Sequence, residues 1–452
     1  MSARSIAPAA AEAHAVPRRV WRGTSLLVLG RIFGSLCTVG ILWTSAQHLS
    51  AEAFGRFTFY LAIFALLDSL ADFGTGQIAV QRTAGDDTAI APVLAATRRI
   101  RLATGSLGVL LVGGGAVLWK EPGAGWILLA SLYPVTHVFE LSSTIFRNRI
   151  AWGVPVAMRA LGSALSFSAV LALASAGDAE SSHYLCGVAF GSAIANGLLH
   201  LAARKHLPRG SVPKAPVRDL LLAALPLGLA SLFQQAYFWA DNVFVRAICG
   251  EEPLGRYNVG VRVMSMTIMV ALFASQAALP WLAREHAAGR LSEAVAKLSQ
   301  PLFALACLGA GCLWPWTGRI LSIFGAGFES AAGSLRWLLG ATAIIYAGSG
   351  LMTALVAAGR TRSILAIAAV GLAANLIANT LLVPRMGIDG AGAATLATEA
   401  VVTIGANAAL ARIGVRPFSG ARGLVWLAGP ALFALAAWAS SRLPLPWILG
   451  DV

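Results

Sequence analysis

The chain has 452 residues, of which 57% are hydrophobic and only 12% are charged, and its mean hydropathy is +0.73. Soluble domains carry about 25% charged residues, so this composition excludes an ordinary soluble protein. A net charge of +14 would indicate a nucleic-acid partner in a soluble protein. Here the basic residues lie between long apolar runs, so we expect no nucleic acid and a membrane protein instead.

The apolar runs predict an all-α polytopic membrane protein with about 13 transmembrane helices. Residues 1–19, before the first run, are rich in alanine and polar side chains. They contain no apolar stretch before a cleavage site, so we expect a cytoplasmic tail and no signal peptide. The expected spans are 23–46, 57–80, 102–119, 124–146, 154–176, 183–203, 219–247, 257–282, 300–324, 333–357, 363–383, 388–411 and 423–441.

Basic residues fall unevenly on the two sides of these spans. With the N-terminus in the cytoplasm, 23 of the 34 Lys and Arg residues lie in cytoplasmic segments, seven on the opposite side and four within spans. Cytoplasmic loops of membrane proteins carry such an excess of positive charge. The sequence therefore predicts a multi-pass membrane protein with a cytoplasmic N-terminus.

An internal repeat divides the chain. The loop AEAFGRF at 51–57 returns as EEPLGRY at 251–257, each between two long apolar runs. An even number of spans per repeat gives two six-helix lobes of the same orientation, related by a pseudo-two-fold axis along the membrane normal. The predicted parts are a tail at 1–19, an N-lobe at 20–203, a basic linker at 204–218, a C-lobe at 219–411, and an extra C-terminal helix and tail at 412–452.

Charged residues inside the spans are the candidate functional residues. Each costs about 2.5–3.5 kcal/mol at the centre of a membrane helix, so each should face protein or water. They are Arg31, Asp68, Asp72, Glu140, Arg159, Asp241, Arg262, Arg336 and Glu399. Equal depth in antiparallel neighbouring spans pairs Arg31 with Asp72, Glu140 with Arg159, and Asp241 with Arg262.

Two interpretations of these charges stay open: structural ion pairs, or a cationic cavity between the lobes that binds an anionic headgroup. Arginine suits a diphosphate because its planar fork donates two hydrogen bonds and stays charged. Arg31, Arg159 and Arg262 are the candidate diphosphate ligands. The candidates for ion coupling or gating are Asp68, Asp72, Asp241 and Glu399.

Uncharged polar residues also lie within spans. Asn375 and Asn379 are four residues apart and therefore share a helix face. Together with Gln234 they are candidate substrate-binding residues, and hydrogen bonding between helices is the alternative. His137 is either a proton relay or a structural residue.

The motifs of common enzyme chemistry are missing. The sequence has no GxxxxGK[ST], no GxSxG and no HExxH, and its five cysteines form no CxxC or metal-type spacing. We therefore expect a protein that is not an enzyme, with no catalytic residues, no metal site and no cofactor.

The opening hairpin resembles that of the oligosaccharide and polysaccharide flippases of the MATE-like superfamily. The family pattern "fG.y" followed by "D.Gl" and a basic end corresponds here to Phe54-Gly55-Arg56-Phe57, Asp72-Phe73-Gly74 and Arg82. In the second half, Asp241, the stretch IFGAGFESAAGSLRWLL, and the run from Asn375 through VPRMGIDGAGAATL continue the likeness. The resemblance covers roughly residues 20–411; the family commonly has 12 or 14 spans, so a thirteenth departs from it.

The resemblance implies a flippase that moves a lipid-linked (polyprenyl-diphosphate) oligosaccharide or polysaccharide precursor from the cytoplasmic to the outer leaflet by alternating access. The expected location is then the bacterial inner membrane, and the energy comes either from an H⁺ or Na⁺ gradient or from downstream consumption of the glycan. The expected partners are the lipid-linked substrate, membrane lipids and glycan polymerase or ligase proteins. The alternatives are a MATE-type cation or drug antiporter and a non-transporting membrane scaffold for a glycan polymerase complex.

Overall fold

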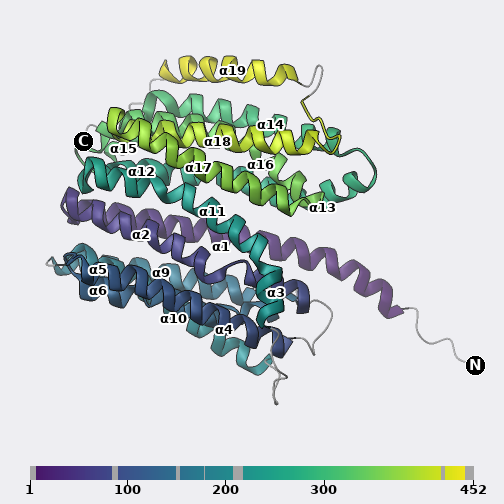
Figure 1. Ribbon diagram of the computed structural model, residues 1–452, viewed down its shortest axis with the longest axis horizontal. Coiled ribbons are helices and arrows are strands. Elements are labelled where there is room, and N and C mark those ends of the chain that lie inside the picture. The colour runs from purple at the N-terminus through teal and green to yellow at the C-terminus, as the bar shows by residue number, and fades with distance from the viewer. Residues whose placement is uncertain are drawn as a thin grey trace, which may run out of the picture. The chain divides into compact units, whose positions relative to one another are not determined.

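The computed structural model describes residues 7–83, 90–148, 153–177, 179–206, 217–418 and 423–442 (Figure 1). Most of the predicted linker (207–216) and the tail from 443 onward lie outside the described residues. Within these ranges there is no strand, and 12 helical stretches are long and apolar enough to cross a membrane. The predicted all-α polytopic architecture is confirmed.

The described part of the first half contains ten α-helices and several short turns of 3₁₀ or π type. The α-helices are α1 (Ala7–His48), α2 (Ala51–Asp72), α3 (Thr75–Thr83), α4 (Ile90–Gly108), α5 (Gly115–Leu118), α6 (Ala124–Ala130), α7 (His137–Glu140), α8 (Ser143–Asn148), α9 (Gly153–Ala176) and α10 (Ser181–Ala203). A π-helical turn at Val109–Gly114 continues α4 into α5, so the third candidate span is Ile90–Leu118. The sequence predicted this span to begin at residue 102, which was wrong by about three turns of helix.

Most helices described in the second half are long. The helices are α11 (Val217–Cys249), α12 (Glu251–Thr267), α13 (Met269–Ala287), α14 (Leu291–Leu313), α15 (Thr317–Ser322), α16 (Ala332–Ala357), α17 (Thr361–Met386), α18 (Ile388–Ala411) and α19 (Leu424–Ser441), and of these α15 is short. Helices α12 and α13 together form one candidate span.

The chain folds into two compact units. Unit 1 comprises residues 1–49 and 63–228, and unit 2 comprises 50–62 and 229–452. In unit 1, α9 packs against α1 and α10; in unit 2, α18 packs against α16 and α17. The lobe boundaries expected from the sequence stay a prediction.

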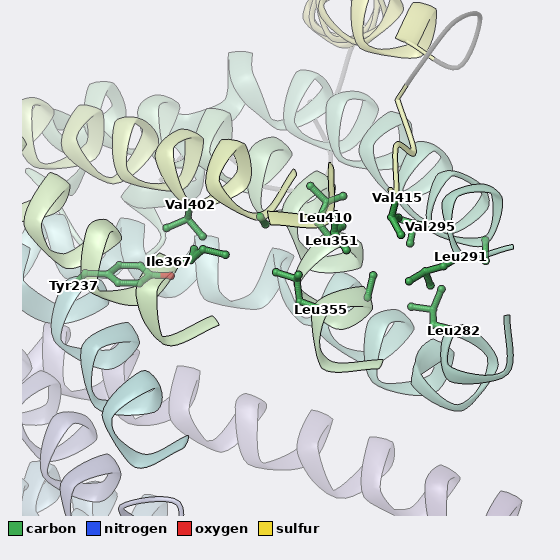
Figure 2. Close-up of a cluster of buried hydrophobic side chains, with 13 residues drawn as sticks. Tyr237, Leu282, Leu291, Val295, Leu351, Leu355, Ile367, Val402, Leu410 and Val415 are labelled. Atoms are coloured by element: carbon green, nitrogen blue, oxygen red, sulfur yellow. The ribbon is translucent and has the colours of Figure 1, made fainter. Parts of the chain in front are cut away.

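A cluster of aliphatic side chains with Tyr237 forms one core of unit 2 (Figure 2). Leu282, Leu351 and Leu410 come from different helices and are fully buried within it. Lipid is as apolar as these side chains, so close packing drives helix association here more than the hydrophobic effect does. Hydrophobicity alone therefore does not say which face of such a helix meets protein.

The two copies of the repeated loop lie against each other within unit 2. A Cβ atom added to Gly55 would lie 1.7 Å from the Glu251 carbonyl oxygen, so only glycine permits this approach of α2 to α12. The Asn258 amide donates to the Thr58 hydroxyl at 3.1 Å, and these residues occupy the same position in the two copies. The two copies of the loop that repeats in the sequence are thus in contact in the structure.

Helix α19 forms where the thirteenth span was predicted, although it is not among the 12 candidate stretches. It packs along α14. The Trp316 indole donates to the Ser440 hydroxyl at 2.7 Å, and that hydroxyl donates to the Cys312 carbonyl at 2.7 Å. These two hydrogen bonds fix the end of α19 on unit 2.

Candidate functional site

The end of α2 in unit 1 is set by the sequence Asp72-Phe73-Gly74. Phe73 and Gly74 both have positive φ, at 42° and 69°, which breaks the helix before α3 begins at Thr75. Gly74 adopts this conformation without a Cβ penalty. The break leaves the Asp72 carboxylate at the end of α2, where it forms an ion pair with Arg101 of α4.

A second break, around Pro134, shapes the same region. Proline cannot donate a backbone hydrogen bond, and the segment from Tyr133 to Glu140 is a 3₁₀ turn followed by a single turn of α-helix. Arg101 Nη1 donates to the His137 carbonyl oxygen at 2.9 Å. In a membrane, a carbonyl freed by a helix break needs such a partner, and the buried Arg101 supplies it.

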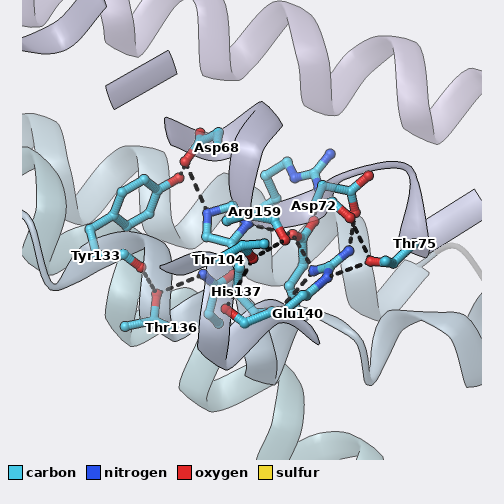
Figure 3. Close-up of polar contacts among 12 residues, drawn as sticks. Asp68, Asp72, Thr75, Thr104, Tyr133, Thr136, His137, Glu140 and Arg159 are labelled. Atoms are coloured by element: carbon cyan, nitrogen blue, oxygen red, sulfur yellow. Dashed lines mark hydrogen bonds and ion pairs between the residues drawn. The ribbon is translucent and has the colours of Figure 1, made fainter. Parts of the chain in front are cut away.

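These breaks gather a cluster of polar side chains (Figure 3). His137 lies between two carboxylates: its Nε2 is 3.1 Å from Asp68 Oδ1, and its Nδ1 is 3.1 Å from Glu140 Oε2. Tyr133 donates to the other Asp68 oxygen at 3.1 Å, and Arg159 donates to Glu140 at 2.8 Å. His137 Nε2 and Asp68 Oδ1 are close enough for an ion pair, but neither makes a well-aligned hydrogen bond.

A cavity of about 320 Å³ opens beside this cluster, entirely within unit 1. It is lined by Asp68, Tyr133, His137, Glu140, Ser143, Pro155, Met158, Arg159, Gly162, Ser163, Ser192, Ala195, Asn196 and Leu199. A second cavity of about 310 Å³ shares the wall formed by Asp68, His137 and Glu140 and extends to Asp72 and Arg101. Volumes near 300 Å³ are at the small end of those of ligand sites.

In unit 2, a second cluster surrounds the buried carboxylate of Asp241 on α11. Its Oδ1 accepts hydrogen bonds from Asn379 at 2.7 Å and Asn375 at 3.2 Å. Its Oδ2 accepts hydrogen bonds from Tyr257 and Thr395, both at 2.7 Å. Helices α12, α17 and α18 thus each donate hydrogen bonds to the Asp241 carboxylate. The two asparagines form the hydrogen bonds between helices that were the alternative to substrate binding.

Two further charges of unit 2 lie near the Asp241 cluster in sequence but outside it. Glu399 is buried one turn after Thr395 on α18, and the Tyr237 side chain lies beside it. Arg262 is half-buried on α12. Within the described part of the chain, the Arg262 guanidinium forms no ion pair or hydrogen bond, whereas each carboxylate oxygen of Asp241 accepts two hydrogen bonds.

The predicted ion pairs have mixed outcomes. The pair of Glu140 with Arg159 is confirmed at 2.8 Å. The pairs of Arg31 with Asp72 and of Asp241 with Arg262 are wrong, because Asp72 binds Arg101 and Asp241 binds four neutral donors. Arg262 follows Tyr257 by five residues, which turns it about 140° around α12 from the side chain that reaches Asp241.

Sequence reasoning missed Arg101, Tyr133, Thr395 and Tyr257. Arg101 was assigned to a loop because the third span was predicted to begin one residue after it, whereas α4 begins at Ile90. The internal repeat contained a signal for the contact between Asp241 and Tyr257 in unit 2. The positions that correspond to Asp241 and Tyr257 in the first copy are Ile41 and Phe57, so both positions are polar in the second copy and apolar in the first.

A family model for polysaccharide biosynthesis proteins matches residues 20–286. The chain belongs to this family. A second family model, MatE, matches residues 226–401 of this polysaccharide biosynthesis protein. No curated protein sequence matches it significantly.

Solved structures of the same fold cover nearly the whole chain. The lipid II flippase MurJ in an inward closed conformation is 12% identical, with a TM-score of 0.71, over 93% of this chain and 97% of MurJ. An inward-facing multidrug resistance MATE family transporter of the MOP superfamily is 13% identical, with a TM-score of 0.66, over 91% and 96% of the two chains. The MATE transporter VcmN of Vibrio cholerae is 13% identical, with a TM-score of 0.61, over 88% and 98%. This family member is therefore a multi-pass membrane protein with the fold of flippases and MATE transporters, and these relatives are not enzymes.

Proposed function

We propose that this protein is a flippase that moves a polyprenyl-diphosphate-linked oligosaccharide, or another polysaccharide precursor, from the cytoplasmic to the outer leaflet by alternating access. Membership of the polysaccharide biosynthesis family and the fold shared with a lipid II flippase support the proposal. The bacterial inner membrane, with the N-terminus in the cytoplasm, is the proposed location. Membrane lipids surround the protein there, and glycan polymerases or ligases are proposed partners.

Arg262 is the observation that carries the proposal. It lies well inside the candidate span Glu251–Ala287, and its guanidinium has no protein partner among the described residues. An arginine costs about 2.5–3.5 kcal/mol at this depth, so an unpaired one is retained for a ligand. A diphosphate matches the planar fork of the guanidinium, and its charge offsets that cost.

Unit 1 supplies further cationic candidates. Arg31 of α1 is exposed and lies within electrostatic range of Arg159 of α9, so the two like charges repel each other. An anion bound near both relieves that repulsion. Arg31 and Arg159 are therefore proposed diphosphate contacts, although Glu140 partly neutralises Arg159. Gln234, Asn375 and Asn379 stay proposed substrate contacts.

The intramembrane carboxylates are proposed to serve ion coupling or gating. Asp68 faces the cavity of unit 1, and Asp72 forms an ion pair with Arg101 at the end of α2. Asp241 has a shell of hydroxyl and amide groups, and Glu399 is buried beside it along α18. Hydroxyl, amide and carboxylate oxygens are groups that an alkali cation can use, and a buried carboxylate can carry a proton. H⁺ or Na⁺ is the proposed coupling ion.

One observation favours a second function, a MATE-type cation antiporter. The cavity of unit 1 is lined by Asp68 and Glu140, which attract cations. The unpaired Arg262 disfavours this function, because a cation site gains nothing from a positive charge held inside the membrane.

Flipping in proteoliposomes tests the proposal. The substrate is a fluorescent polyprenyl-diphosphate oligosaccharide that a membrane-impermeant reductant bleaches in the outer leaflet only. We expect Arg262→Ala to slow flipping at least about tenfold, which corresponds to the loss of one charge-assisted hydrogen bond of about 1.4 kcal/mol or more. Arg262→Lys should retain part of the rate.

Arg336→Ala is the matched control, because Arg336 lies over the Trp314 ring, 5.8 Å from its centre, and so has a partner in the protein. Full flipping by Arg262→Ala at equal protein yield would refute the role of Arg262. Absence of flipping by the wild type, together with extrusion of a cationic dye, would favour the antiporter. Absence of both would favour the scaffold.

A further inference from the structure

The polar lining of the unit 1 cavity is more than an ion-pair network. The Ser143 and Ser192 side chains line the cavity, and neither hydroxyl forms a hydrogen bond in the described part of the chain. Asn196 donates to Thr136 at 3.1 Å, which leaves its carbonyl oxygen without a partner among the described residues. Asp68 Oδ1 has an ion-pair neighbour but no well-aligned donor. Several hydrogen-bond donors and acceptors on this wall can therefore form further hydrogen bonds.

The charge of the lining excludes a diphosphate as the main occupant. Two carboxylates, Asp68 and Glu140, face the cavity, and Arg159 is the one guanidinium in the lining. Arg159 is already paired with Glu140 at 2.8 Å. His137 faces both carboxylates, so a phosphate placed here would meet the Asp68 charge while the basic groups of the lining already have carboxylate partners.

The shape and chemistry fit a sugar ring. Carboxylates, an amide and hydroxyls can each accept from or donate to the vicinal hydroxyls of a pyranose. The apolar side chains of Pro155, Met158 and Leu199 provide a surface for its C–H face. Aromatic faces favour a lipophilic cation, and Tyr133 is the one aromatic side chain besides His137 in this lining.

We propose that this cavity is a glycan subsite that binds a neutral or amino sugar. The proposal rests on the proposed flippase function, since the sugar it receives is then the glycan part of the lipid-linked substrate. At this subsite Arg159 orients Glu140 through their ion pair. Asp68, Ser143, Ser192 and Asn196 contact the sugar (Figure 3 shows Asp68 at the edge of the cluster).

Three sugars that differ in charge on the same ring test the proposal: glucosamine, glucose and glucuronate. Their affinity for the purified full-length protein in detergent is measured by saturation-transfer NMR. We expect glucosamine to bind at least as tightly as glucose, and glucuronate about tenfold more weakly than glucose because of the Asp68 charge. Asp68→Asn should remove most of that difference.

Ser143→Ala and Ser192→Ala are the decisive variants, because neither hydroxyl has a protein partner to lose and the fold is retained. Each should weaken glucose binding about three- to tenfold, the value of one hydrogen bond. Ser175→Ala is the matched control, since its hydroxyl bonds to its own helix at Ala172, away from the cavity. It should leave binding unchanged.

Flipping is measured on the same variants, so that the two proposals fail separately. Slower flipping of the glycolipid by Ser143→Ala and Ser192→Ala, with competition by free glucosamine, supports the subsite. Normal flipping with no saturable binding of any of the three sugars overturns the subsite and leaves the flippase intact. Equal or tighter binding of glucuronate, or preference for the cation tetraphenylphosphonium over all three sugars, also overturns it. Sugar binding without flipping by the wild type refutes the flippase and keeps a sugar site.

Discussion

Replacing Asp241 by alanine should destabilise unit 2 more than any other single truncation of a polar side chain there. Alanine leaves four hydrogen-bond donors facing a buried space that has no acceptor. Hydrogen bonds to a charged group contribute about 1.5–3 kcal/mol each, so the four have a gross value of about 6–12 kcal/mol. The free-energy cost of removing the carboxylate from water offsets much of this sum. The net loss in the free energy of unfolding when such a network is broken is about 3–5 kcal/mol.

Asp241→Asn should cost less, about 1–2 kcal/mol. The amide oxygen can replace Oδ1, where two asparagine amides donate, and the new NH₂ group can replace Oδ2. The Tyr257 and Thr395 hydroxyls can then rotate to accept instead of donate. The substitution therefore keeps the hydrogen bonds and removes the charge.

Equilibrium unfolding by SDS in mixed micelles, followed by tryptophan fluorescence, measures these differences in the free energy of unfolding. Asp219→Ala is the control, because Asp219 is exposed on the same helix, and it should change stability by less than about 0.5 kcal/mol. A free energy of unfolding for Asp241→Ala within about 0.5 kcal/mol of the wild type would refute the network. Equal losses for the alanine and asparagine variants would show that the charge, and not hydrogen-bond acceptance, stabilises unit 2.

Three further substitutions test other contacts by the same unfolding measurement. Arg101→Ala should cost about 3–5 kcal/mol, since it removes a buried guanidinium from a carboxylate and a carbonyl; a cost below about 1 kcal/mol would contradict this pairing. Gly55→Ala should be strongly destabilising because its Cβ would lie 1.7 Å from a carbonyl oxygen of α12, whereas the control Gly309→Ala, inside α14, meets nothing within 4 Å and should not destabilise the protein. Ser440→Ala should cost about 1 kcal/mol through the lost bonds of α19 and should expose Trp316 to a quencher; unchanged quenching would show that α19 is held otherwise.

The sequence by itself determined the class of the fold. Runs of apolar residues of membrane-spanning length predicted 12 of the helical stretches and the helix at the C-terminal end. Helix periodicity also placed Asn375 and Asn379 on one face, and depth in the membrane paired Glu140 with Arg159. The prediction for the two asparagines holds because it depends on regular geometry along one helix, whereas equal depth in the membrane identified one pair of three.

Only the tertiary structure decided which polar side chains meet. The broken segment around Pro134 places His137 between two carboxylates, and no helical periodicity describes a helix that is interrupted. Arg101 reaches the carbonyl and the carboxylate that two such breaks leave without partners. Asp241 bonds to Tyr257 instead of Arg262 because the rotation of α12 about its axis, which packing sets, turns Tyr257 toward it. Depth along the membrane can be read from a sequence, whereas rotation about a helix axis and the position of a break depend on neighbours that only the folded chain supplies.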